Sequence, residues 1–294
     1  MTHPQPKDYL KLHLIVVILG FTAILGRLTD VSALGVVFYR TFLASLGMFL
    51  LARFQKRNIL IPLKDSLPLL GVGGIIALHW MCFFGSARAS TIAISLVTFS
   101  VTSFFTSILE PLVNKTKISW VEVLLGVLVV MGMYFVFTFE YRHLTGIIIG
   151  IIGAFLATVF SVLNAQLTRK YDSQTITFYE MTGAFVASWV LIPLIMFTVP
   201  DTHFQLIPSP TDWIWIAILG LVCTVYPYNE MLKLLKKISA FTLNLSINME
   251  PIYGILLAYI IFGEKERMTT GFYIGGVLIL LSVVLHPFLR KKPH

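Results

Sequence analysis

The chain has 294 residues, of which 57% are hydrophobic and 12% are charged, and its formal net charge is +8. Its mean hydropathy is +0.85. A soluble globular domain carries about a quarter charged residues, so these values exclude an ordinary soluble domain and indicate a protein whose solvent is lipid. Cys82 and Cys223 lie in apolar stretches and are expected to be small packing residues, with no disulfide and no metal site.

Ten stretches are long and apolar enough to cross a bilayer as helices, which takes about 20 residues each. In chain order they cover about 10–28, 33–53, 67–87, 91–112, 119–139, 144–167, 175–198, 212–233, 240–262 and 268–289. The first stretch is too long for the apolar part of a signal peptide and lacks a small-residue cleavage site, so we expect it to remain as a span. Residues 200–212 hold three prolines and are predicted to form a loop.

The lysine and arginine residues indicate how the spans are oriented, because cytoplasmic links of membrane proteins are enriched in them. If the N-terminus is cytoplasmic, the inner segments hold 16 of these residues and the outer links hold 5, with Arg40 inside a span. This ratio predicts that both termini are cytoplasmic. It also explains the positive net charge without a nucleic-acid partner.

The chain contains an internal repeat. Residues 38–40, Phe-Tyr-Arg, begin the second stretch, and residues 178–180, Phe-Tyr-Glu, begin the seventh, 140 positions later. Gly-Val-Leu at 126–128 recurs at 276–278, an offset of 150. An odd number of spans separates the two copies, so they are predicted to cross the membrane in opposite directions, as in inverted-repeat transporters. The two repeats are predicted to cover 1–142 and 143–294.

Short motifs near the end of the chain carry a family resemblance: Met-Glu-Pro at 249–251, Phe-Gly-Glu-Lys at 262–265 and Gly-Gly at 275–276. Through them, and over nearly its whole length, the chain resembles the EamA-type ten-helix members of the drug/metabolite transporter superfamily. The first half departs from the motif, because Ser100 and Val101 stand at the positions equivalent to Glu250 and Pro251.

The resemblance implies an all-α membrane protein of ten transmembrane helices, arranged as two inverted five-helix repeats around a central cavity. It further implies multi-pass insertion in a bacterial inner membrane. The activity that it implies is export or facilitated movement of amino acids or related small metabolites, through a cavity that opens alternately to each side.

Four ionisable residues are predicted to lie at membrane depth, where such groups usually face a bundle interior or a wet cavity. Arg40 is either a structural cation or a binding site for an anionic group. The second alternative follows from its planar guanidinium, which can bind both oxygens of a carboxylate. His79 either hydrogen-bonds a neighbouring helix or contacts substrate or protons. Glu250 either supports a kink at Pro251 or binds an ammonium group or a proton. Glu180 is predicted to lie in the inner half of the pathway, too far from Arg40 for an ion pair.

Neutral polar and aromatic side chains within spans complete the predicted pathway. Asn244 and Asn248 share a helix face, because they are four residues apart. Ordinary hydrogen bonding between helices is the alternative explanation for these polar residues. The remaining candidates are Tyr39, Trp80, Thr98 and Asn164. Residues 228–230 (Tyr-Asn-Glu) and Glu110 are instead interpreted as groups at the inner membrane surface.

The sequence therefore predicts a secondary transporter whose partners are the lipid bilayer, a small-molecule substrate and, as one alternative, protons. A facilitator and a proton-coupled antiporter both remain open. The predicted inverted repeat argues against a receptor or scaffold, which does not need two oppositely oriented halves. The sequence contains no recognisable catalytic motif, which argues against an intramembrane enzyme. No cofactor or metal is expected, and the oligomeric state is left open.

Overall fold

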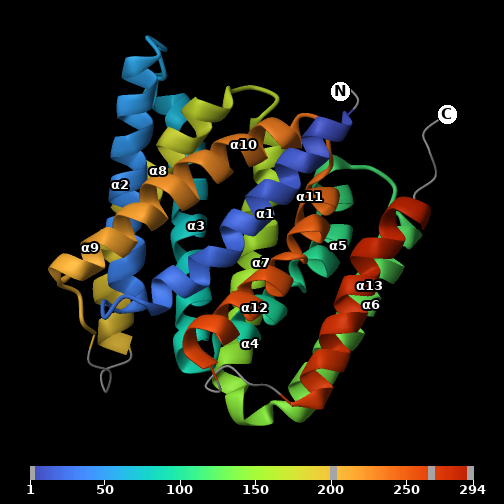
Figure 1. Ribbon diagram of the computed structural model, residues 1–294. Helices are drawn as coiled ribbons and strands as arrows, with labels where there is room; N and C mark the ends of the chain where they lie inside the picture. The colour runs from blue at the N-terminus through green and yellow to red at the C-terminus, as the bar shows by residue number, and fades with distance from the viewer. Residues whose placement is uncertain (1–3, 199–203, 264–268, 290–294) are drawn as a thin grey trace.

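The computed structural model describes residues 4–198, 204–263 and 269–289, which form a bundle of helices without any strand in those segments (Figure 1). The helices are α1 (Pro6–Arg27), α2 (Ala33–Phe54), α3 (Leu63–Ala89), α4 (Ile92–Phe99), α5 (Thr102–Asn114), α6 (Trp120–Phe139), η1 (Tyr141–His143), α7 (Leu144–Leu167), α8 (Ser173–Thr198), α9 (Pro210–Ala217), η2 (Ile218–Val225), α10 (Tyr226–Leu235), α11 (Ala240–Ile247), α12 (Glu250–Phe262) and α13 (Thr270–Leu289).

The described residues contain ten helical units that are long and apolar enough to span a membrane, which confirms the predicted number. Four of the units combine more than one element: α4 with α5, η1 with α7, α9 with η2 and α10, and α11 with α12. The third span is longer than predicted and covers Leu63–Ala89. Pro200, Glu264 and Lys265, which the sequence analysis used, lie outside the described residues.

The fourth and ninth spans break at nearly equivalent places of the two sequence repeats. In the ninth span the break lies at Asn248 and Met249, before Pro251. Pro251 has no backbone N–H, so the helix loses one of its hydrogen bonds there. In the fourth span the nearest proline is Pro111, well beyond the break, and the hydroxyls of Thr102 and Ser103 donate to the backbone oxygens of Phe99 and Ser100 at 2.6 and 2.9 Å. Such back-bonding bends helices.

The eighth span contains a π-helical segment, η2, between α9 and α10. Thr224 in this segment donates to the carbonyl oxygen of Leu219, five residues earlier, at 2.6 Å. Gly220 in the same segment faces the backbone oxygen of Arg40 on α2, so that a Cβ there would lie 3.1 Å from this atom. π-Helical turns are frequent at functional sites, and this one brings the eighth span close to Arg40.

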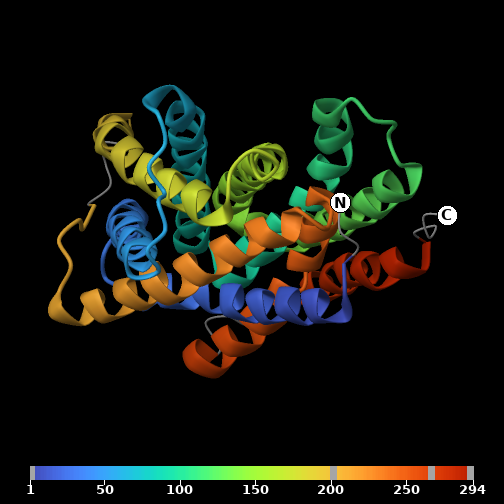
Figure 2. The same cartoon turned by 90° about the horizontal axis from the view of Figure 1, so that it is seen from above.

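α3 packs between α7 and α8 along much of its length (Figures 1 and 2). α6 and α13 pair with each other at one side of the molecule. Their contact depends on Gly132 and Gly275, because a Cβ on either would come within 2.6 Å of the other's carbonyl oxygen. Only glycine permits this approach.

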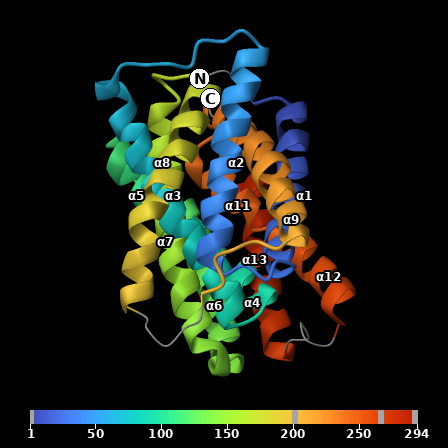
Figure 3. The ribbon, with the colours of Figure 1, turned by 90° about the vertical axis from the view of Figure 1, so that its left-hand side faces the viewer.

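α2 and α8, which carry the repeated tripeptides, pack side by side in antiparallel directions (Figure 3). The rings of Phe42 and Phe185 are 5.3 Å apart, and those of Phe49 and Phe178 are 6.1 Å apart. Residue numbers thus rise along α2 as they fall along α8. By this register, Arg40 on α2 lies at the level of residue 187 on α8, which is about seven residues after Glu180. The two charged side chains are therefore separated by about 10 Å along the helix axis. The two charged groups form no ion pair among the described residues.

Candidate functional site

A cavity of about 110 Å³ lies in the middle of the bundle, between α1, α2, α3, α4, α7, α10, α11 and the starts of α5 and α12. Its walls are mainly apolar, and a few polar groups converge on it. Seven of the ten predicted pathway residues line it: Arg40, His79, Trp80, Asn164, Asn244, Asn248 and Glu250. The interrupted fourth and ninth spans both reach this cavity. Residues that are distant in the sequence are therefore brought together at one place.

Arg40 is the cation of the cavity, and it is only 1% exposed. Its Nε donates to the hydroxyl of Thr224 at 2.7 Å. Its Cζ lies 3.9 Å from the ring centroid of Trp80, which is a cation–π contact. No carboxylate lies within ion-pair distance of Arg40 in the described residues. The guanidinium is thus fixed from one side by the π-helical segment and from another by α3, and its charge is not neutralised by a direct partner.

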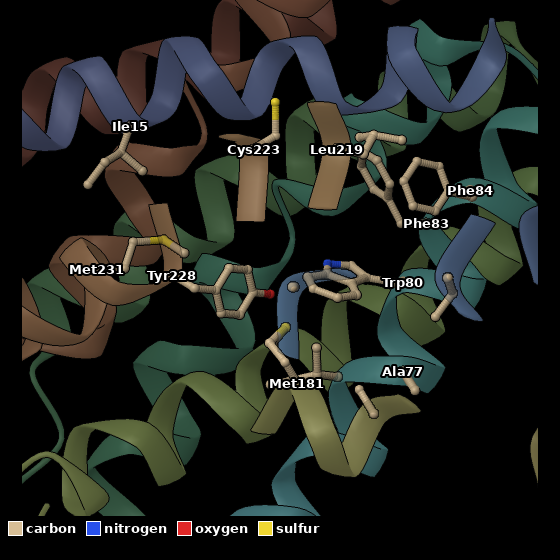
Figure 4. Packing of buried hydrophobic residues seen from close by; sticks show 14 of the residues in the cluster. Ile15, Ala77, Trp80, Phe83, Phe84, Met181, Leu219, Cys223, Tyr228 and Met231 are labelled. Atoms are coloured by element: carbon tan, nitrogen blue, oxygen red, sulfur yellow. The ribbon is translucent and has the colours of Figure 1, made fainter. Parts of the chain in front are cut away.

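Aromatic rings form a continuous wall beside the guanidinium. The rings of Trp80 and Tyr228 meet edge to face at 5.2 Å and point toward one another in Figure 4. Phe160 stacks on Tyr228 with ring centroids 6.3 Å apart. His79 contacts Phe160 and Phe99 edge to face at 5.1 and 5.2 Å. This wall keeps water from the charged group and gives the cavity an apolar character.

His79 is held by a neighbouring helix, which was one of the two interpretations of its sequence position. Its Nδ1 lies 3.0 Å from the backbone oxygen of Gly153 on α7. Because a carbonyl oxygen can only accept, Nδ1 carries the hydrogen of this bond. His79 also lines the cavity, so this bond sets the orientation in which its ring faces the cavity.

Glu250 is the anion of the cavity and begins α12, directly after the break in the ninth span. Its side chain is half-buried. It interacts electrostatically with Arg40, but no ion pair or hydrogen bond joins the two groups in the described residues. The cavity is therefore lined by one guanidinium and one carboxyl group without direct contact between them.

A ladder of amides and hydroxyls connects the two broken spans. The Asn244 amide donates to Thr106 at 2.8 Å and its oxygen accepts from Ser161 at 3.2 Å. The hydroxyl of Ser103 lies 3.0 Å from the Asn248 side chain. When the Asn248 oxygen instead accepts the single Ser103 hydrogen, Ser103 no longer donates to Ser100, and the Asn248 nitrogen donates to the backbone oxygens of Ser100 and Asn244 at 3.3 and 3.2 Å. The break in the fourth span is thus bonded to the break in the ninth.

Glu180 lies behind the cavity wall and is fully buried. The amide nitrogen of Asn164, which does line the cavity, donates to Glu180 Oε2 at 3.4 Å. The other oxygens of this pair, Glu180 Oε1 and Asn164 Oδ1, have no hydrogen-bond partner among the described residues. This is a buried carboxyl group whose hydrogen bonding is incomplete.

Two other predicted pathway residues are placed elsewhere. Tyr39 packs its ring against Trp213 at 5.0 Å, away from the cavity lining. Thr98 donates to the backbone oxygen of Ile94 at 2.7 Å and fills the space beside Gly150. Both side chains pack between helices, so the structure does not bring them to the site that Arg40 and Glu250 share.

Sequence reasoning missed Thr224, Phe160 and Tyr228, which help to form the site. Tyr228 lies deeper than expected and lines the cavity, whereas its neighbour Glu230 bonds Lys11 at 2.6 Å, as an interfacial carboxylate would. No charge or repeated motif distinguished these three residues in the sequence.

Ion pairs gather at the end of the bundle where α1 begins. Lys11 and Lys233 bond Glu230 at 2.6 and 2.5 Å, and Lys237 bonds Asp8 at 2.8 Å. In the loop between α7 and α8, Lys170 donates to Asp65 at 2.6 Å. The hydrogen bond that the Lys170 ammonium donates to the Asp65 carboxylate raises the pKa of Lys170. These pairs connect the ends of helices whose middle parts surround the cavity.

The opposite end is held by bonds to the segment between α1 and α2. Arg88 on α3 donates to the backbone oxygens of Gly26 and Thr29 at 3.1 Å, and also to that of Val31. Asp212 at the start of α9 accepts from the backbone N–H of Asp30 at 2.9 Å. A second cavity, of about 520 Å³, borders Arg88 and Asp30 at this end.

Comparison with known proteins identifies the family. The sequence matches the EamA-like transporter family over residues 8–138 and 144–286. An uncharacterized transporter of Archaeoglobus fulgidus is 24% identical over 270 residues, 92% of each chain. An uncharacterized transporter of Synechocystis is 27% identical over 192 residues, which cover 62% of this chain and 53% of that protein.

Two further similarities concern function and fold. The pseudopaline exporter CntI of Pseudomonas aeruginosa is 26% identical over 192 residues, 64% of this chain and 63% of that protein. A protein of known crystal structure shares the fold with a TM-score of 0.69, over 99% of this chain and 100% of its own, at 13% identity. The family match extends over nearly the whole chain, and the described residues contain ten apolar helices long enough to span a membrane. This chain is therefore a multi-pass membrane transporter that belongs to the EamA-like transporter family.

Proposed function

We propose that this protein is a secondary transporter of amino acids or related small zwitterionic metabolites. The observation that carries the proposal is the pair formed by Arg40 and Glu250, which line one cavity with opposite charges and without a direct bond between them. A zwitterion presents a carboxylate and an ammonium group at a short fixed separation. Arg40 would receive the carboxylate, and Glu250 the ammonium group.

The surroundings of Arg40 support this role over that of a purely structural cation. Thr224 bonds Nε and leaves the terminal nitrogens without a partner in the described residues, and Trp80 covers one face of the guanidinium. The terminal N–H groups of arginine suit the two oxygens of a carboxylate. The low-polarity aromatic wall strengthens such a contact, because charges interact more strongly away from water.

Transport by alternating access between two inverted repeats, at 1–142 and 143–294, is part of the proposal. The antiparallel packing of α2 against α8 and the near-equivalent breaks in the fourth and ninth spans support it. In transporters of this kind, interrupted helices meet at the substrate site near the membrane midplane. The lysine and arginine pattern supports cytoplasmic termini, and the similarity to an exporter supports outward movement across a bacterial inner membrane.

The proposal is tested by counterflow in proteoliposomes loaded with unlabelled L-amino acids and supplied outside with a radiolabelled mixture of the same compounds. We expect the wild-type protein to accumulate label transiently. Arg40→Ala is expected to abolish the accumulation of label. Arg40→Lys is expected to weaken it strongly, because lysine keeps the positive charge but cannot bind both oxygens of a carboxylate as the planar guanidinium does. Glu250→Gln is expected to reduce counterflow as well.

Arg142→Ala is the matched control, since Arg142 is exposed and lies in the short connection between α6 and α7. It should behave as the wild type. Each variant is compared by its elution profile in detergent before reconstitution. Normal counterflow by a correctly folded Arg40→Ala protein would refute the assignment of the carboxylate site. No counterflow of any amino acid by the wild type would refute the substrate class.

A further inference from the structure

Glu180 and Asn164 form a hydrogen-bonded pair that is incomplete. The Glu180 side chain is 0% exposed, and its only described donor is the Asn164 amide, at 3.4 Å from Oε2. Glu180 Oε1 and Asn164 Oδ1 are both buried, and both are acceptors without a donor among the described residues. An acid and an amide can bond each other twice, but only if the acid carries a proton. The missing component of this pair is therefore one hydrogen.

The elements packed around Glu180 offer no cation in its place. α2 contributes Arg40, which lies about 10 Å further along the helix axis by the α2–α8 register. α7 carries no titratable residue. α3 contributes His79, which bonds Gly153, and α10 contributes Tyr228 and Glu230. Of these groups, Tyr228 is the one that interacts electrostatically with Glu180.

An ionised carboxylate in this position would be strongly unfavourable. A buried charge is tolerated when it is paired and hydrogen-bonded, and otherwise the group becomes neutral. Glu140 shows the contrast, because this carboxylate is also buried but accepts from the backbone N–H and the hydroxyl of Thr269 at 2.9 and 2.7 Å. Within the described residues, Glu180 has no comparable set of donors.

We propose that Glu180 is a proton-binding site of the transporter, and that Asn164 connects it with the central cavity. The proton is bound as Glu180–COOH, with its hydrogen available to Asn164 Oδ1. When the cavity side of Asn164 is hydrated, the acid releases one proton to water and remains as a carboxylate that accepts from the Asn164 amide. Rebinding of a proton reverses the step. Coupling of this exchange to substrate movement rests on the proposed transport function.

The proton site itself is tested by infrared spectroscopy on the purified protein in liposomes, without substrate. We expect the pH-difference spectrum to contain a band of a protonated carboxylic acid that disappears as the pH is raised. This band should be absent from Glu180→Gln and present, unchanged, in the matched control Glu140→Gln. It should be shifted in Asn164→Leu, because the acid loses its amide partner.

The coupling is tested in proteoliposomes with an imposed pH gradient and the radiolabelled L-amino acid mixture. We expect the gradient to drive accumulation by the wild type and by Glu140→Gln. In Glu180→Gln the accumulation ratio should fall to one, while counterflow persists, because exchange of substrate does not need net proton movement. Glu180→Asp should restore part of the accumulation.

The two assays separate failure of this inference from failure of the proposed function. A titrating band assigned to Glu180 in a protein that moves no amino acid would keep the proton site and reject the substrate class. A band that is unchanged in Glu180→Gln, that does not respond to pH, or that responds to sodium at constant pH would overturn the proton site. Full gradient-driven accumulation by Glu180→Gln would overturn its coupling role.

Discussion

Replacing Gly73 by alanine is expected to separate α3 from α8 beside Glu180. A Cβ at Gly73 would lie 2.2 Å from the backbone oxygen of Glu180 and 2.7 Å from the backbone nitrogen of Ala184. Ordinary contact begins at 3.4 Å, so the two helices would have to move apart by about 1.2 Å at this crossing. The neighbouring variant Gly74→Ala is a matched control, because its Cβ would meet only the Ala187 methyl group, at 3.6 Å.

The size of the effect follows from two opposing terms. Forcing an extra methyl group into a packed interior costs about 1–3 kcal/mol. Alanine in place of glycine favours a helix by about 1 kcal/mol, and this gain is common to both variants. Gly74→Ala is therefore expected to be as stable as the wild type or slightly more stable, and Gly73→Ala less stable than Gly74→Ala by about 1–3 kcal/mol.

The assay is thermal unfolding of the detergent-purified variants, followed by gradient-driven accumulation in proteoliposomes. Because the Asn164 contact to Glu180 is already 3.4 Å long, a further separation of α3 and α8 should also weaken gradient-driven accumulation in Gly73→Ala. Equal unfolding midpoints for Gly73→Ala and Gly74→Ala would refute the reasoning, since the close approach would then not determine the packing of these helices.

Two further substitutions test the support of Arg40 and the ion pairs at the helix ends. Thr224→Val removes the acceptor of Arg40 Nε and should lower stability by about 1.5–3 kcal/mol, seen as a lower unfolding midpoint than in Thr198→Val, whose hydroxyl is exposed. Lys170→Ala should leave the midpoint and counterflow unchanged, because its pair with Asp65 is solvent-exposed. A loss in Lys170→Ala as large as that in Thr224→Val would contradict this ranking.

The number and type of the elements could be predicted from the sequence, because each transmembrane helix satisfies its own backbone hydrogen bonds and needs only a long apolar stretch. The ten spans and the break near Pro251 are of this kind. The break at Ser100 could not be predicted, because no proline marks it and it depends on where nearby hydroxyls bond. The π-helical segment ends two residues before Pro227, so a proline marks an irregularity there but does not predict its π-helical form.

The candidate site was partly predictable for a related reason. Charged residues in apolar stretches stand out, so Arg40, His79 and Glu250 were found from the sequence, and all three line the cavity. Thr224 and Phe160 were not found, because threonine and phenylalanine occur throughout such helices. Their roles depend on which neighbour they touch. For Thr224 that neighbour is Arg40, 184 positions away in the chain.

The sequence by itself thus determined that the chain is a ten-helix membrane protein with a repeat and with charged residues inside its spans. Solvation explains this, because the cost of placing each group in lipid depends mainly on the residue itself and its local stretch. Only the tertiary structure decided that Arg40 and Glu250 share one cavity while Glu180 lies behind its wall beside Asn164. The relative positions of these side chains depend on how the helices are aligned and where they cross. Both are set by packing between segments that are distant in the sequence.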